Sequence, residues 1–202
     1  MDKIKVAIVG TGTISNHHIQ SYLKNPNVEL YAFCDLDEAK VKMMAEKYGV
    51  SRTYTDEETM LKELPEIDAV SVCVWNSAHM PCTVMALNYG KHVLCEKPMA
   101  ITLAECEAMV EAAKKNGKFL MIGHNQRLAK AHSVARKLIV DGLIGDIVTF
   151  RTTFGHGGPE TWSVDPGLNT WFFDKTRAAM GAMADLGIHK TDLIHYLTGQ
   201  QV

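Results

Sequence analysis

Residues 185–197, DLGIHKTDLIHYL, carry acidic and imidazole side chains at helical spacing. Asp185, His189, Asp192 and Tyr196 stand at i, i+4, i+7 and i+11, which places them on one face of a helix. An imidazole titrates near neutral pH, and a neighbouring carboxylate can orient it, so Asp185 and His189 suit proton transfer. A polar helix face with capping and ion-pair roles fits the same pattern. A metal site is not expected, because Asp185 and His189 lack a third ligand in this stretch.

A second candidate group is Glu96-Lys97-Pro98 in the stretch LCEKPMA, directly after the apolar run that ends at Cys95. If that run is a strand of a parallel sheet, the three residues lie at the carboxyl edge, where ligands of open α/β sheets bind. A lysine there can donate to a reacting oxygen and hold positive charge against a developing alkoxide. Pro98 restricts the conformation of Lys97 before it. An exposed lysine at a strand end is the alternative, and the tripeptide alone favours neither.

The turn GTGTIS, residues 10–15, follows the apolar run IKVAIV and could bind phosphate. Such a turn needs one glycine for the tight bend, a second for close approach to a diphosphate, and a small third residue where helix and strand pack. Gly10, Gly12 and Ser15 occupy these places. Thr13 and Ile14 lie where backbone N–H groups at the start of the next helix face an anion. A plain glycine-rich bend between strand and helix is the alternative.

Asp35 supports the phosphate-binding interpretation. It ends the second apolar run, 23 residues after Gly12, where an acid is expected to hold a ribose diol. Asp35 and Asp37, with no adjacent arginine, disfavour an additional 2′-phosphate, so NAD is expected as the cofactor in preference to NADP. The alternative is that Asp35 is a solvent residue at a strand end.

Two further stretches place polar and aromatic side chains near these groups. In WNSAH, residues 75–79, Asn76 and His79 could border the nicotinamide end of a dinucleotide, whereas Asn76 or Ser77 could instead cap a helix. Polar and aromatic side chains also suit a sugar ring, although an aromatic residue fits a core equally well. GHNQR and FGHGGPETW contribute three such residues: Arg127, His156 and Trp162.

The elements that would position these residues alternate between short strands and amphipathic helices from residue 3 to about residue 123. Strands are expected at 3–9, 28–34, 52–55, 69–74, 92–96 and 119–123. Helices are expected near 14–24, 37–48, 57–63, 79–89 and 103–116, the last with a capping box of Thr102 and Glu105. This alternation predicts an α/β fold with a parallel sheet covered by helices on both faces.

After Gly123 the pattern changes. A helix is expected at 127–141, a strand at 146–154, an irregular stretch at 155–176 and a helix at 179–198. A lone strand and helices of this kind cannot bury their apolar faces by themselves. We therefore expect two units, 1–123 and 124–202, the second of them incomplete.

Composition limits the class of partner. The 202-residue chain has a formal charge of −2 and 47% hydrophobic residues, and its charges are mixed without a basic stripe, so a small molecule is expected and nucleic acid is not. The longest apolar stretches are too short to span a bilayer, and the start lacks a secretory leader pattern, so a cytoplasmic location is expected. Five cysteines without a C-x-x-C pair predict neither zinc ligation nor a disulfide framework.

Three of these motifs together resemble the Gfo/Idh/MocA family of NAD(P)-dependent oxidoreductases, which includes glucose-fructose oxidoreductase and inositol dehydrogenases. They are GTGTIS near the start, CEKPMA at 95–100 and GAMADLGIHKTDLIHYL at 181–197. The resemblance implies a doubly wound Rossmann sheet followed by the beginning of an α+β domain with an open, mainly antiparallel sheet. It also implies a catalytic trio, matched here by Lys97, Asp185 and His189. Trp75 departs from the pattern, because many relatives have proline before the asparagine.

The resemblance further implies that a secondary hydroxyl of a sugar, sugar derivative or cyclitol is oxidised by hydride transfer to nicotinamide. Whether Lys97 or His189 is the base stays open. The expected substrate contacts are Lys97, Arg127, His156, Asp185 and His189. The expected cofactor contacts are Gly10, Gly12, Thr13, Ile14, Asp35, Asn76, His79, Glu96 and Lys97.

A full-length member is expected to form a homodimer or homotetramer. Two other functions are compatible with the resemblance. One is glycoside cleavage through transient oxidation by a tightly held NAD. The other is a non-catalytic NAD-binding regulator, which would have no need for all three residues of the trio.

Overall fold

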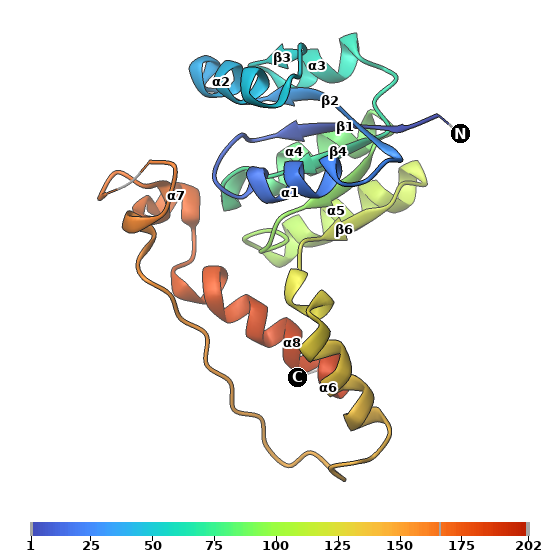
Figure 1. Cartoon of the computed structure of the whole chain (residues 1–202), viewed down its shortest axis with the longest axis vertical. Helices are drawn as coiled ribbons and strands as arrows, with labels where there is room; N and C mark the ends of the chain where they lie inside the picture. The colour runs from blue at the N-terminus through green and yellow to red at the C-terminus, as the bar shows by residue number, and fades with distance from the viewer. Residues whose placement is uncertain (1, 166, 201–202) are drawn as a thin grey trace.

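The computed structural model describes residues 2–165 and 167–200. Its central feature is a six-stranded sheet in the order β3-β2-β1-β4-β5-β6, in which all neighbours are parallel (Figure 1). The strands are β1 (Ile4–Val9), β2 (Val28–Cys34), β3 (Thr53–Tyr54), β4 (Ala69–Val72), β5 (His92–Cys95) and β6 (Leu120–Ile122). The predicted parallel α/β sheet is therefore confirmed, strand by strand.

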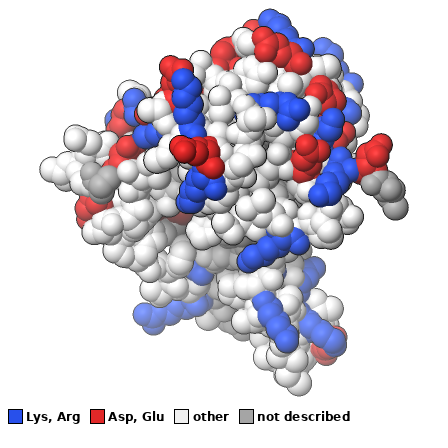
Figure 2. Space-filling model, turned by 45° about the horizontal axis from the view of Figure 1, so that its top comes forward, with Lys and Arg blue, Asp and Glu red and all other residues white. Residues whose placement is uncertain are grey.

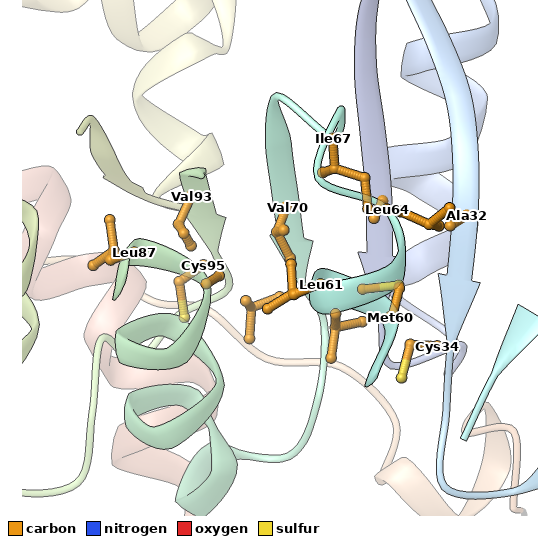
Figure 3. Packing of buried hydrophobic residues seen from close by; sticks show 14 of the residues in the cluster. Ala32, Cys34, Met60, Leu61, Leu64, Ile67, Val70, Leu87, Val93 and Cys95 are labelled. Atoms are coloured by element: carbon orange, nitrogen blue, oxygen red, sulfur yellow. The ribbon is translucent and has the colours of Figure 1, made fainter. Parts of the chain in front are cut away.

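Helices cover both faces of this sheet, because alternate residues of each strand point to opposite faces. Ile8 of β1 packs in one buried cluster with Ile19 and Val41. Its neighbours Ala7 and Val9 belong to a second cluster, part of which Figure 3 shows, with Met60, Leu61, Leu87 and Met109. The helices that supply these residues are α1 (Ser15–Leu23) and α2 (Glu38–Tyr48) on the first face, and α3 (Glu57–Glu63), α4 (His79–Asn88) and α5 (Leu103–Asn116) on the second.

The predicted capping box fixes the start of α5. Thr102 Oγ1 accepts a hydrogen bond from the backbone N–H of Glu105 at 3.2 Å, and Glu105 Oε2 accepts one from the N–H of Thr102 at 3.1 Å. Two N–H groups that the first turn leaves unpaired are satisfied in this way.

The strand order reverses at β1, with β2 and β3 on one side and β4, β5 and β6 on the other. At such a point the loops that follow β1 and β4 leave the carboxyl edge toward opposite faces and open a crevice between them. Gly10 follows β1, Asp35 follows β2, and Glu96 follows β5. The sheet thus brings these candidate residues to one edge, as the sequence predicts.

Beyond β6 the described residues form helices and irregular chain. The elements are η2 (Asn125–Leu128), α6 (Lys130–Val140), η3 (Pro159–Thr161), η4 (Trp171–Phe173), α7 (Lys175–Ala178), the π-helix η5 (Met183–Gly187) and α8 (Ile188–Thr198). Helices α6 and α8 pack side by side (Figure 1). The strand expected at 146–154 was wrong: these residues pair with no strand of the described chain, and a strand exists only where a neighbour accepts and donates its backbone hydrogen bonds.

The helix expected at 179–198 begins later than the spacing predicts. Ala179 has a φ of 60°, in the left-handed region, which ends α7. The π-helix η5 then precedes α8, and its wider turn breaks the 3.6-residue repeat before Ile188. Likewise, the helix expected from 127 starts at Lys130, because residues 125–128 form a 3₁₀ turn.

The surface shows mixed charge. Over the upper part of the view in Figure 2, acidic and basic side chains intermingle. Within the described residues, no helix combines the length and apolarity needed to cross a bilayer. All five cysteines are free thiols.

Candidate functional site

A cavity of about 950 Å³ lies along the carboxyl edge of the sheet. Its walls include the turn after β1, the ends of β2, β4 and β5, the first turn of α4, and residues of the stretches 162–165 and 171–172. Lys97, Asp185 and His189 line it together with Gly12 and Asp35. The structure therefore joins the two chemistry-bearing motifs and the glycine turn in one continuous space.

The glycine turn has the shape that a diphosphate requires. Gly10 has a φ of +89°, and a Cβ there would lie 2.6 Å from the carbonyl oxygen of Cys73, so only glycine fits. At Gly12 a Cβ would meet no atom within 4 Å, which leaves room for a ligand against the backbone. Ser15 Oγ donates to the carbonyl oxygen of Gly12 at 2.7 Å and closes the turn. Thr13 and Ile14 line the cavity just before α1 begins.

The carboxylate of Asp35 is hydrogen-bonded to this turn. Its Oδ2 accepts hydrogen bonds from the backbone N–H and the Oγ1 of Thr11, at 2.6 and 2.8 Å. Sequence reasoning missed Thr11, whose only signal is a hydroxyl between two glycines. The side chain of Lys40 forms two ion pairs: its Nζ is 2.9 Å from Asp165 Oδ1 and 3.9 Å from Asp37 Oδ2. Asp35 and Lys40 both line the cavity.

Lys97 and Asp185 form a direct pair. Lys97 Nζ donates to Asp185 Oδ1 at 3.0 Å and to the backbone carbonyl of Asp185 at 2.9 Å. Their side chains are only 16% and 21% exposed, so the ion pair is poorly screened by water. The other carboxylate oxygen, Oδ2, lies 3.4 Å from Nε2 of His156. The carboxylate thus fixes the lysine ammonium and also touches the segment after residue 154.

His189 is buried, and its Nδ1 has no hydrogen-bond partner among the described residues. Burial lowers the pKa of this imidazole to about 4, and the positive charge of Lys97 acts in the same direction. The ring edge packs against Phe154, with centroids 5.6 Å apart. At neutral pH His189 is therefore an uncharged imidazole with a free ring nitrogen.

A chain of buried polar groups lies behind Glu96. His18 Nε2 is 2.8 Å from Glu96 Oε1, and its Nδ1 is 3.0 Å from Ser71 Oγ, which in turn is 2.7 Å from Tyr22 OH. Burial acts to raise the pKa of Glu96, but the hydrogen bond and charge of His18 hold it below its ordinary value. Glu96 Oε2 accepts the backbone N–H of Lys97 at 3.2 Å. His18 was missed from the sequence, because nothing in its spacing links it to Glu96.

Asn76 and His79 line the cavity and hold its walls together. Asn76 Nδ2 donates to the carbonyl of Ala178 at 2.8 Å, and this bond joins the 3₁₀ turn η1 (Asn76–Ala78) to α7. The His79 ring lies between two carbonyl oxygens, of Pro98 at 2.6 Å and of Val74 at 3.1 Å. Burial lowers the pKa of His79. The alternative of a capping role is wrong, since neither Asn76 nor Ser77 caps η1 or α4.

Three of the four residues predicted to share one face, His189, Asp192 and Tyr196, lie in α8 at matching spacing, and Arg127 contacts both Asp192 and Tyr196. Asp185 lies in the π-helix and binds Lys97, whereas Asp192 accepts two hydrogen bonds from the guanidinium of Arg127. The π turn shifts the register between them. Arg127 is consequently committed to Asp192 and does not line the cavity, contrary to the expectation of a substrate contact.

The segment after residue 154 closes one side of the cavity. The N–H of Val164 donates to Thr13 Oγ1 at 2.9 Å, and Asp165 pairs with Lys40. Trp162 lines the cavity, with its ring 5.3 Å from that of His156. Trp171 and Phe172 add aromatic surface that the sequence did not single out. Among the described residues, no cluster of three or more His, Cys, Asp or Glu side chains could hold a metal ion.

The chain is similar in sequence to known dehydrogenases. The chain is 34% identical over 198 residues to D-glucoside 3-dehydrogenase of Escherichia coli (strain K12), covering 97% of this chain and 54% of that protein. It is 29% identical to myo-inositol 2-dehydrogenase of Thermotoga maritima, covering 98% and 56%. The chain thus spans about half the length of the curated relatives it matches.

Solved structures show the same arrangement of the chain. Levoglucosan dehydrogenase in complex with NADH and levoglucosan superposes with a TM-score of 0.88 at 27% identity, over 98% of this chain and 55% of that one. Aldose-aldose oxidoreductase from Caulobacter crescentus, complexed with glycerol, gives 0.82 at 32% identity, over 98% and 58%. Residues 4–124 match the oxidoreductase family with an NAD-binding Rossmann fold, and residues 132–202 match the GFO/IDH/MocA C-terminal domain. The chain belongs to the Gfo/Idh/MocA family of oxidoreductases.

Proposed function

We propose that this chain is the cofactor-binding and catalytic part of a dehydrogenase that oxidises a secondary hydroxyl of a sugar, sugar derivative or cyclitol with NAD. The observation that carries the proposal is the meeting of Lys97, Asp185 and His189 in the cavity that also contains the glycine turn. Proton-transfer groups beside a diphosphate site are what an alcohol dehydrogenation requires.

The residues present fit a dinucleotide. Gly10, Gly12 and the N-terminus of α1 would hold the diphosphate, and Asp35 would hold the ribose of the adenosine half. When bound, the nicotinamide supplies a hydride acceptor. NAD is preferred to NADP in this proposal, because the carboxylates of Asp35 and Asp37 would repel a 2′-phosphate and Lys40 is paired with Asp165.

In the proposed reaction, His189, whose imidazole lines the cavity, removes the hydroxyl proton of the substrate. Its neutral form at physiological pH supports this role, because a base must be unprotonated before it accepts. Lys97 donates a hydrogen bond to the same oxygen and balances the negative charge that develops there. Asp185 holds the Lys97 ammonium at 3.0 Å and so sets its direction.

The substrate class rests on the aromatic wall and on the relatives. Trp162 lines the cavity and offers an aromatic ring to a sugar or cyclitol, and His156 packs against it and lies 3.4 Å from Asp185. The relatives named above include a D-glucoside dehydrogenase and an inositol dehydrogenase.

For the longer protein we propose residues 1–123 and 124–202 as two units, cytoplasmic location and dimeric or tetrameric assembly through a further sheet. Exposed Val134, Leu138 and Val140 of α6 provide apolar surface for such a sheet.

The test is to incubate the protein with NAD and a panel of sugars, inositols and glycosides, following both reduced nicotinamide absorbance and released sugar. His189→Ala is expected to lower kcat by roughly two to four decades while NAD affinity stays unchanged. His132→Ala, which removes an imidazole of α6 that does not line the cavity, serves as the matched control. Loss of NAD binding in His189→Ala would contradict the assignment. Sugar release without accumulation of reduced cofactor would favour glycoside cleavage instead.

A further inference from the structure

Four polar side chains behind the candidate site form a chain of hydrogen bonds that the proposed reaction does not use. Tyr22 and His18 stand one turn apart on α1, Ser71 lies on β4, and Glu96 follows β5. Ser71 is fully buried, and the side chains of His18 and Glu96 are each 10% exposed. Of these four residues, only Glu96 lines the cavity. The other three are therefore placed to act through Glu96 rather than on a ligand.

The hydrogen bonds fix the direction of the His18 ring. Its Nδ1 lies 3.0 Å from Ser71 Oγ, which is 2.7 Å from Tyr22 OH, and its Nε2 lies 2.8 Å from Glu96 Oε1. A carboxylate oxygen only accepts hydrogen bonds, so Nε2 carries the proton that joins the ring to Glu96. Ser71 and Tyr22 hold the opposite side of the ring and keep this N–H directed at the carboxylate.

The carboxylate of Glu96 is held at both of its oxygens. While Oε1 accepts from His18, Oε2 accepts the backbone N–H of Lys97 at 3.2 Å. A Cβ at position 123 would lie 3.1 Å from Oε1, so the bare backbone of Gly123 leaves room for the carboxylate beside it. The orientation of Glu96 thus depends on one side chain, that of His18, and on the backbone around it.

The charge of Glu96 reaches the proposed base. Glu96 acts to raise the pKa of His189, whereas the ammonium of Lys97 acts to lower it. Burial acts to raise the pKa of Glu96 itself, and the hydrogen bond from His18 is the main effect that opposes burial. Without His18, only Lys97 would oppose burial, and the pKa of Glu96 would rise.

Other titratable groups face these two residues and stay in place when His18 is replaced. Those that face Glu96 are His79, His124 and the thiols of Cys73 and Cys95. Those that face His189, besides Glu96 and Lys97, are His124 and Asp185.

We propose that His18 is a positioning residue for the proposed oxidation: its Nε2–H holds Glu96 as a charged and oriented carboxylate, and Glu96 strengthens His189 as a base. This inference rests on the function proposed above. His18 touches neither substrate nor cofactor in this assignment, and its effect passes through Glu96. A protonated Glu96 would remove one of the negative charges that favour transfer of a proton to His189, which makes the imidazole a weaker base.

The experiment uses two substitutions that preserve different halves of the imidazole. In His18→Gln the amide nitrogen can replace Nε2 and still donate to Glu96, whereas the shorter side chain in His18→Asn reaches only the position of Nδ1. His132→Asn is the matched control, since it removes an imidazole of α6 that does not line the cavity. Circular dichroism checks that each variant is folded.

Two measurements are made on each protein. The first is kcat at pH 6 and pH 9, with NAD and the member of the panel above that the wild-type protein oxidises fastest. The second needs no substrate: carbon-13 NMR follows the side-chain carboxyl signals of labelled glutamate from pH 5 to pH 9. The signal of Glu96 is identified by its absence in Glu96→Gln.

His18→Asn is expected to lower kcat about 10-fold at pH 6 and less than about 3-fold at pH 9, because Glu96 regains its charge as the pH rises. The Glu96 signal should titrate over this range in His18→Asn, but it should stay at the carboxylate position in the wild type and in His18→Gln. His18→Gln should keep most of the wild-type kcat at both pH values, and His132→Asn all of it.

A loss of kcat in His18→Asn that is the same at pH 6 and pH 9 would indicate a purely structural role and overturn the inference. An equal loss in His18→Gln, or a Glu96 carboxyl that stays ionised in His18→Asn, would overturn it as well. If the wild-type protein oxidises no member of the panel, the proposed function fails, whereas the NMR comparison still tests the hold of His18 on Glu96. Should His18→Asn fail to fold, His18→Leu removes the same hydrogen bond with a side chain suited to a buried position, and the same results are expected.

Discussion

Because the buried imidazole of His189 is neutral at pH 7, we expect the protein to lose stability in acid, and we expect replacement of His189 to remove part of that loss. Burial, together with the charges of Lys97 and His124, lowers its pKa from 6.5 to about 4. A change of that size corresponds to about 3 kcal/mol, at about 1.4 kcal/mol for each pH unit. Because the unfolded chain binds this proton first as the pH falls, the contribution of His189 to the free energy of unfolding is complete above pH 6.5. It is lost progressively down to pH 4.

Urea unfolding at pH 7 and pH 5, followed by tryptophan fluorescence, measures this effect. About 2 kcal/mol of the wild-type loss between these values is expected to come from His189, so His189→Gln should lose about 2 kcal/mol less than the wild type. His17→Gln, on the exposed side of α1, should behave as the wild type does. Equal losses in His189→Gln and the wild type would show that the imidazole is not held neutral, and the argument that it is ready to accept a proton would fail.

Two further substitutions test the buried charges. Burial raises the pKa of Glu57 from 4.5 to about 7, so its contribution to stability is complete below pH 4.5 and is lost as the pH rises through 7. Glu57→Gln should therefore match the wild type at pH 4.5 and exceed it by about 3 kcal/mol at pH 9 in thermal unfolding, whereas parallel pH profiles would contradict this account. Arg127→Ala leaves the carboxylate of Asp192, whose side chain is 6% exposed, without its guanidinium. It should cost roughly 2–4 kcal/mol in urea unfolding with NAD affinity unchanged, and wild-type stability would refute the structural role.

The Rossmann part could be predicted almost residue by residue, because its elements depend on local signals. Short β-branched runs such as 28–34 and 92–95 are buried between two layers of helices, and the capping box at Thr102 marks a helix start that needs no tertiary information. The glycines at 10 and 12 and the acid at 35 follow a fixed spacing for the same reason. Parallel pairing then brings the strand ends to one edge.

The second part of the chain could be predicted less well. Periodicity alone suggested a strand at 146–154, but a strand also needs a partner, and none is present among the described residues. The π turn at Met183–Gly187 has no signal in a spacing argument built on 3.6 residues, so the helix that begins at Ile188 was expected to begin near residue 179. Both errors arise where the structure depends on contacts rather than on local preference.

The candidate site could also be predicted only in part. Lys97, Asp185 and His189 could be identified from residue type and position, and the fold brings them together. Thr11 and His18 could not, because their partners Asp35 and Glu96 lie 24 and 78 residues away along the chain. Such long-range hydrogen bonds follow from the topology of the sheet, which the sequence pattern describes only in outline.

The bridge between Val164 and Thr13 has a kinetic consequence. It joins a segment from the second half of the chain to the phosphate-binding turn through one hydrogen bond, helped by the half-exposed pair of Lys40 and Asp165. Two exposed contacts of this kind together hold about 1–2 kcal/mol, so the closed form is favoured over the open form by about 5- to 30-fold. A dinucleotide can therefore enter and leave when these two contacts break briefly, while the sheet stays intact. The rate should rise with ionic strength, because salt screens the pair of Lys40 and Asp165.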